Sequence, residues 1–190
     1  MSLMLLAVVS FFGAADVPNV SADAHVNELA TRTYINMRLG ALAAPAAAST
    51  QICLEVDATA DFGVDACGNA SIFSPGKAAP ELALFRGKLR GPSYESADGN
   101  VESWLGIGFA ELQVGADAPG FYFLDTGPYG VETSGPVVTG SARGLLPLGM
   151  GTELVAEISL GVAYLPHAVE LPIPQSPFQS LVSFSIGAGF

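Results

Sequence analysis

The chain has 190 residues, half of them hydrophobic, with a mean hydropathy of +0.45 and a formal net charge of −11. This length suits one domain, and the acidic balance excludes nucleic-acid binding, because affinity for a phosphate backbone comes from Lys and Arg. Every apolar run is shorter than the ~20 residues of a membrane-spanning helix, so a core, partner chains or lipid around a barrel must cover the apolar residues.

Residues 1–30 are predicted to form an N-terminal arm. Residues 2–15, SLMLLAVVSFFGAA, are almost entirely apolar and lack the preceding Lys or Arg of a signal peptide. We interpret them as a retained assembly arm that buries its side chains against neighbouring subunits or a membrane. The arm residues are Leu3, Leu5, Leu6, Val8, Val9, Phe11 and Phe12. A cleaved signal peptide ending near residues 22–24 is the alternative.

Beyond residue 30 the dominant pattern is an alternation of period two, which predicts β-strands with one buried face. In 52–62 the apolar residues Ile52, Leu54 and Val56 begin a series in which every second residue is apolar. The same alternation returns in 154–164 and 182–190. Weaker strand candidates are 31–39, 68–74, 81–90, 101–114, 120–125 and 136–142. Gly- and Pro-rich turns separate the strands, which is typical of an all-β sandwich or barrel.

Two connections stand out between these strands. Residues 41–48, ALAAPAAA, are predicted to be a linker or a short arm, because Pro45 interrupts the helix that Ala favours. Four prolines in 166–177 predict an extended, irregular crossover before the final strand. Helix is expected only near 24–31 or in short connections.

The two cysteines, Cys53 and Cys67, flank a predicted hairpin, where a disulfide forms if the fold brings their backbones close enough. Two free thiols are the equal alternative. Asp57, Asp61 and Asp65 are weak calcium candidates, for which a solvated acidic hairpin is the simpler interpretation. No spacing suits zinc and no nucleotide or hydrolase motif occurs, so we expect no metal, no cofactor and no catalysis.

Residues 85–91, FRGKLRG, place Arg86, Lys88 and Arg90 on one face of a strand. On an acidic molecule this basic stripe is predicted to contact a neighbouring copy; the alternative is an edge strand that its charges protect from stray pairing. Trp104 lies in a strand that is apolar on both faces, so it is predicted to be a core residue of a central strand. Gly106, in the same strand, is expected where a neighbouring backbone or bulky side chain approaches closely.

The chain end SLVSFSIGAGF resembles the closing strand of bacterial outer-membrane β-barrels, with the aromatic Phe190 preceded by apolar residues at every second position. With ELVAEISLGVAYL at 153–165, this resemblance implies a barrel of the bacterial outer membrane whose signal peptide is cleaved. Three features count against it: the missing N-terminal positive charge, the basic stripe that a lumen would have to hold, and the prolines of 166–177.

The same region also resembles single jelly-roll proteins, namely viral capsid subunits and tumour-necrosis-factor/C1q-like modules. The order of the last strands in such modules is matched here by LLPLGMGTELVAEISL, then an irregular stretch, then SPFQSLVSFSI. This resemblance implies an eight-stranded sandwich that assembles as trimers or in higher symmetry, with an N-terminal arm reaching beyond the domain.

From the sequence we predict a single jelly-roll β-sandwich over 31–190, carrying the arm 1–30, that serves as a self-assembling structural protein of a virion. Its predicted partners are copies of itself, other shell proteins and, for the arm, a membrane. Arg86, Lys88, Arg90 and Phe190 are the predicted subunit contacts. An outer-membrane β-barrel is the alternative, and a secreted carbohydrate-binding sandwich is a remote one.

Overall fold

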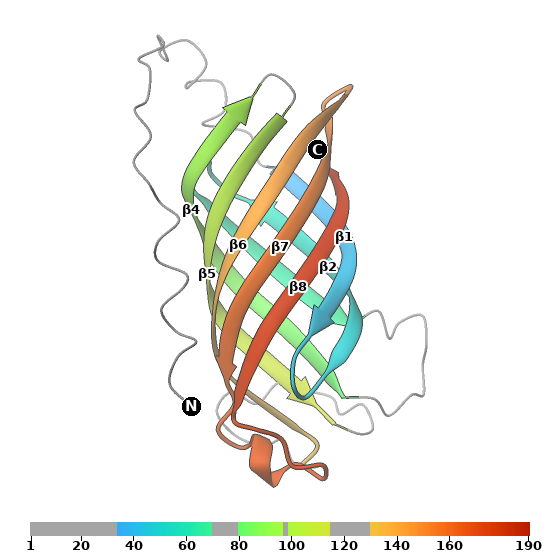
Figure 1. Cartoon of the computed structure of the whole chain (residues 1–190), viewed down its shortest axis with the longest axis vertical. Helices are drawn as coiled ribbons and strands as arrows, with labels where there is room; N and C mark the ends of the chain where they lie inside the picture. Colours follow the sequence, from blue (N-terminus) through green and yellow to red (C-terminus); the bar gives the residue numbers. More distant parts are fainter. Residues whose placement is uncertain (1–33, 70–79, 97–98, 115–129) are drawn as a thin grey trace.

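In the computed structural model, eight antiparallel strands form one closed barrel, and the last strand pairs back onto the first (Figure 1). The structure describes residues 34–69, 80–96, 99–114 and 130–190. The strands are β1 (Tyr34–Ala43), β2 (Ala48–Asp57), β3 (Phe62–Asn69), β4 (Glu81–Ser96), β5 (Gly99–Gln113), β6 (Glu132–Gly149), β7 (Thr152–Tyr164) and β8 (Phe178–Gly189).

The barrel has two unlike ends. At one end, here called the turn end, the strands are joined by the short connections 58–61, 97–98 and 150–151. At the other end, here called the loop end, the segments between consecutive strands are 44–47, 70–80, 114–131 and 165–177. The segment 165–177 includes the 3-10 helix η3 (Ala168–Glu170), which lies at the opposite end of the barrel from the C-terminus in Figure 1.

The predicted jelly-roll sandwich is wrong. A jelly roll folds two sheets over one another through Greek-key crossovers, whereas each strand here pairs with its neighbours in sequence around a single ring. The resemblance of the chain end to a closing barrel strand is confirmed, since β8 pairs with both β7 and β1. The alternation of period two was a sound signal for strands, but both architectures share it.

The two faces of the strands point the opposite way from the prediction. Leu54 of β2, taken from its pattern as a core residue, is half exposed on the outer wall, whereas its neighbours Cys53 and Glu55 are buried inside. The same inversion holds on β7, where Ile158 and Leu160 face outward and Glu157 faces inward. The barrel therefore presents apolar side chains to its surroundings and charged side chains to its interior.

The interior has two layers along the barrel axis. Along β1, which runs toward the loop end, Arg38 precedes Leu42; along β4, which runs away from it, Leu84 precedes Arg86. Charged groups therefore fill the turn half, and the loop half is mainly apolar, with the polar Gln51, Thr133 and Gln179 also buried there. The apolar layer consists of Leu42, Ala46, Ala47, Cys53, Cys67, Leu82, Leu84, Ala110, Leu112, Val114, Val137, Ala163, Leu165, Ala168, Leu171 and Leu181.

The two connections singled out from the sequence both belong to the loop end. Residues 44–47, predicted as part of a linker, instead form the tight connection of the β1–β2 hairpin, in which Ala44 N donates to Ala47 O at 2.7 Å. The proline-rich segment 165–177 joins neighbouring strands rather than crossing between sheets, and Leu165 and Leu171 insert into the apolar layer. In the part of the chain that the structure describes, no helix is long and apolar enough to cross a membrane.

Candidate functional site

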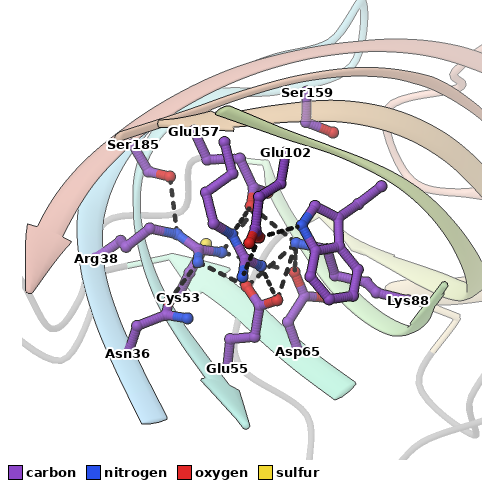
Figure 2. A network of polar contacts seen from close by, with 12 residues as sticks. Asn36, Arg38, Cys53, Glu55, Asp65, Lys88, Glu102, Glu157, Ser159 and Ser185 are labelled. Carbon is purple, nitrogen blue, oxygen red and sulfur yellow. Dashed lines mark hydrogen bonds and ion pairs between the residues drawn. The ribbon is translucent and has the colours of Figure 1, made fainter. Parts of the chain in front are cut away.

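A network of ion pairs fills the turn half of the lumen (Figure 2). It joins five carboxylates to five basic side chains, so their formal charges cancel. The acids are Glu55, Asp57, Asp65, Glu102 and Glu157, and the bases are Arg38, Arg86, Lys88, Arg90 and Arg143. These bases are all the Lys and Arg residues of the described segments, and the outer wall of those segments therefore carries none.

Lys88 lies at the centre of the acidic side chains. Its Nζ is 2.8 Å from Glu157 Oε2, 3.1 Å from Glu55 Oε1 and 3.9 Å from Asp65 Oδ2. These three buried carboxylates lie close enough together to bind a metal ion in principle. The lysine ammonium already supplies the positive charge there, so the geometry describes an internal salt bridge rather than a metal centre.

Arg143 connects the network to the turn end and to the aromatic ring inside the lumen. Its Nη1 is 2.9 Å from Asp57 Oδ2, its Nε is 3.2 Å from Glu157 Oε2, and its Nη2 pairs with Glu55. The guanidinium carbon lies 4.7 Å from the centre of the Trp104 ring. Trp104 Nε1 donates to Glu102 Oε2 at 3.0 Å, so the buried indole satisfies its polar atom within the same network.

Arg86 forms the most regular pair, because its guanidinium meets the Asp65 carboxylate with two parallel hydrogen bonds, at 2.9 and 2.5 Å. The two residues are direct cross-strand partners on β4 and β3. Gly106 on β5 makes room for this arginine: a Cβ there would lie 2.4 Å from Thr139 Oγ1 and 3.3 Å from Arg86 Cδ. The expectation of a close approach at Gly106 is confirmed.

The basic stripe has a different environment from the one predicted. Arg86 and Lys88 are buried in the lumen against acids of the same chain, and Arg90, which is 23% exposed, pairs with Glu102 at 2.6 Å. These side chains therefore do not face a neighbouring subunit. They do not protect an edge either, because β4 is paired on both sides. Phe190, the fourth predicted contact, lies half exposed on the outer wall, where its N donates to Ile35 O.

The remaining predicted residues divide into those that the fold joins and those that it separates. Cys53 and Cys67 are cross-strand partners on β2 and β3 and form a disulfide inside the lumen. Of the calcium candidates, Asp57 and Asp65 point into the lumen and pair with arginines, whereas Asp61 lies exposed in the turn between their strands, so no shared loop site exists. The arm residues Leu3 to Phe12 lie outside the described residues.

Sequence reasoning missed the acids Glu55, Glu102 and Glu157 and the arginines Arg38 and Arg143 as members of one cluster. Part of the signal was present in the alternation, because Glu55 and Glu157 stand on the polar rows of strands whose other rows are apolar. Glu102 could not be found in this way, since its strand is apolar on both rows.

No protein-family model matches the chain, and neither does any curated protein sequence. Among solved structures, the chain is similar to Ail, the attachment invasion locus protein of Yersinia pestis, with 10% identity, a TM-score of 0.41 and coverage of 83% of this chain and 94% of that one. It is also similar to the N-terminal β-barrel domain of Pseudomonas aeruginosa OprF, with 6% identity, a TM-score of 0.43 and coverage of 84% and 100%.

The strand order shows that, of the two architectures that the sequence resembled, this chain adopts the barrel and not the jelly roll. The virion function was inferred from the jelly roll and has no remaining support. The carbohydrate-binding sandwich loses its basis for the same reason, because the strands form no sandwich.

Proposed function

We propose that the chain is a β-barrel of the bacterial outer membrane, held in the bilayer by its outer wall and closed to ions by its interior. The observation that carries this proposal is the inverted alternation: apolar side chains face outward and charged side chains face inward around the ring. Such a surface is costly in water and favourable in lipid, and a closed barrel leaves no strand edge unpaired in the hydrocarbon.

The outer wall has the charge distribution that a lipid-facing belt requires. Among the described strand residues, the acids outside the ion-pair network lie near strand ends. Glu81 and Glu111, on the outward row, and the buried Glu132 are at the loop end, whereas Glu95 and Glu153 are at the turn end, on the same side of the wall as the lumen residues Glu102 and Glu157. Between the two ends the outward positions are apolar or small, as on Ile107, Ile158 and Phe184. This belt is the part of the wall that we assign to the hydrocarbon.

The connection lengths support one orientation. Outer-membrane barrels have short turns on the periplasmic side and longer loops outside the cell. Here the connections at the turn end are short, and those at the loop end include the segments 70–80, 114–131 and 165–177. We therefore place the turn end in the periplasm and the loop end at the cell surface.

The interior supports a membrane anchor rather than a pore. An eight-stranded barrel is just wide enough for its own side chains to fill. Here the turn half holds a neutral ion-pair network, and the loop half holds a buried apolar layer with Leu82, Leu112 and Leu165 at most 1% exposed. An ion would have to break buried salt bridges and then enter an apolar layer, and both steps cost several kcal/mol.

Membrane insertion is tested by electrophoresis in SDS without heating and by fractionation of cells that express the full chain. The expected result is a folded form that migrates differently from the boiled chain and that fractionates with the outer membrane. A chain that remains in solution without detergent, with the same migration before and after boiling, would overturn the proposal.

The closed interior is tested separately in planar lipid bilayers. Folded protein is expected to add no stepwise conductance, whereas an added porin serves as the positive control. Stable channel steps from the folded protein would refute the closed interior and leave membrane insertion standing.

A further inference from the structure

The outer wall of the described strands carries a groove between its side chains. It has a volume of about 450 Å³ and lies over β2, β3, β4 and β5. We propose that this groove is a binding site for a single fatty acyl chain of a membrane lipid, an inference that rests on the proposed membrane function. Its volume falls in the range of small-molecule binding sites.

The groove results from small residues between larger ones. Its floor is formed by Ala66 of β3 and Gly87 of β4, which carry little or no side chain on the outward face. Leu54 of β2 forms one wall, and the rings of Phe85 and Phe109 form the other. These two rings are stacked with centroids 5.0 Å apart, so they form a continuous aromatic wall.

Gly87 is the position at which the groove depends on a missing side chain. A Cβ at Gly87 would lie 3.5 Å from the ring of Phe62 and 3.8 Å from Ile107 O, both ordinary van der Waals contacts, so nothing in the packing of the barrel requires glycine there. Its backbone has no positive φ, so turn geometry does not require glycine either. The glycine keeps the floor low in the middle of a strand, between Arg86 and Lys88, whose side chains point inward.

The chemistry of the groove selects an acyl chain as the occupant. The outward side chains that line it are apolar: Leu54, Val56, Val64, Ala66, Phe85 and Phe109. A lipid headgroup or a polar ligand would therefore find no side-chain hydrogen bond in it. A second copy of the chain is the weaker candidate, because apolar contact between proteins gains no hydrophobic driving force when lipid tails already cover both surfaces.

The experiment compares lipid retention by the wild type, Gly87→Leu and a matched control, Gly140→Leu. Gly140 of β6 is an exposed glycine on the same outer wall, and a Cβ there would have no heavy atom within 4 Å. Each protein is folded in vesicles of phosphatidylethanolamine, released in mild detergent and measured by native mass spectrometry. Ala66→Leu fills the same floor from β3 and serves as a second groove variant if Gly87→Leu does not fold.

We expect one phosphatidylethanolamine to stay bound to the wild type and to Gly140→Leu, and to be lost from Gly87→Leu. Equal retention by the groove variant, or no bound lipid on a folded wild type, would overturn the inference and leave the membrane proposal intact. A two-chain species that Gly87→Leu abolishes would identify a second copy as the occupant and overturn it as well. A wild type whose migration in SDS does not change on heating would overturn the membrane proposal itself, and this inference with it.

Discussion

Asp65 and Arg86 stand directly opposite one another on β3 and β4 and are held by two hydrogen bonds of 2.9 and 2.5 Å inside the lumen. A pair with this geometry combines the attraction of opposite charges with two directed hydrogen bonds. Both side chains are nearly inaccessible to solvent. Arg86 also donates to Thr139 and Ser159 on β6 and β7. One side chain thus connects four of the eight strands across the lumen.

We predict that Arg86→Met lowers the free energy of unfolding by about 3 kcal/mol, because it leaves the buried Asp65 carboxylate without its main partner. The loss stays at the lower end of the usual range since Lys88 and Arg38 lie 3.9 and 3.8 Å from that carboxylate. Denaturant titration of the barrel folded in lipid vesicles measures the change. The double variant Arg86→Met with Asp65→Leu should recover part of it, and an equal or larger loss in the double variant would contradict the explanation.

The chain has one tryptophan, which offers a direct test of which face is inside. Trp104 is 4% exposed within the lumen, whereas the next residue, Leu105, is 47% exposed on the outer wall. In vesicles of brominated lipid, Trp104 should keep most of its fluorescence because the wall separates it from the bromine atoms. The variant Trp104→Phe with Leu105→Trp should lose most of its emission. Equal quenching of the two proteins would mean that the assignment of the faces is wrong.

The strands could be predicted from the sequence better than their arrangement. The rows at 154–164 and 182–190 correspond to β7 and β8, because alternation follows from the pleat of any strand. The row at 52–62 covers the end of β2 but runs on through the turn 58–61 to the first residue of β3. Alternation does not say which row faces solvent, and the apolar row was assigned to a core as in a soluble protein. That assignment placed Arg86 and Lys88 on the surface, where they suggested a subunit contact.

The charged lumen could not be predicted because its partners are far apart in sequence. Arg143 pairs with Asp57 across 86 residues, and Lys88 with Glu157 across 69. These residues come to the same level along the barrel axis only when the ring closes, because the register of each intervening strand pair sets their positions. The disulfide was easier to anticipate, since Cys53 and Cys67 flank one hairpin.

We predict that the Cys53–Cys67 bond stabilises the barrel without being needed for its fold. The bond closes a segment with a sequence separation of 14, and a loop of this size is worth at most about 3 kcal/mol through the unfolded state. The variant Cys53→Ala with Cys67→Ala should keep its heat-dependent migration and lose up to that amount in denaturant titration.

Both cysteines are nearly inaccessible in the folded barrel, at 1% and 3% exposure. A reducing agent and an alkylating reagent added to the folded protein should therefore label neither cysteine, whereas the same treatment after unfolding should label both. Labelling of the folded protein would show that the bond is absent or open to solvent. An oxidised pair also fits the periplasm, through which an outer-membrane protein passes.

The outer belt predicts that the cost of a positive charge depends on its position along the barrel axis. Ile158 lies in the middle of β7 and is 50% exposed, with Glu157 and Ser159 on either side pointing into the lumen. Ile158→Arg should lower the free energy of unfolding in vesicles by about 2–4 kcal/mol, because the guanidinium would have to enter the hydrocarbon.

Met150 provides the matched control for this substitution. It is fully exposed, at 101%, in the turn that joins β6 to β7 beyond the belt. There Met150→Arg should cost no more than about 1 kcal/mol, since the side chain reaches water or headgroups. In a soluble barrel the order would not hold, because both positions would face water and both arginines would be tolerated. Equal, small effects at Ile158 and Met150 would therefore argue against a lipid-facing wall.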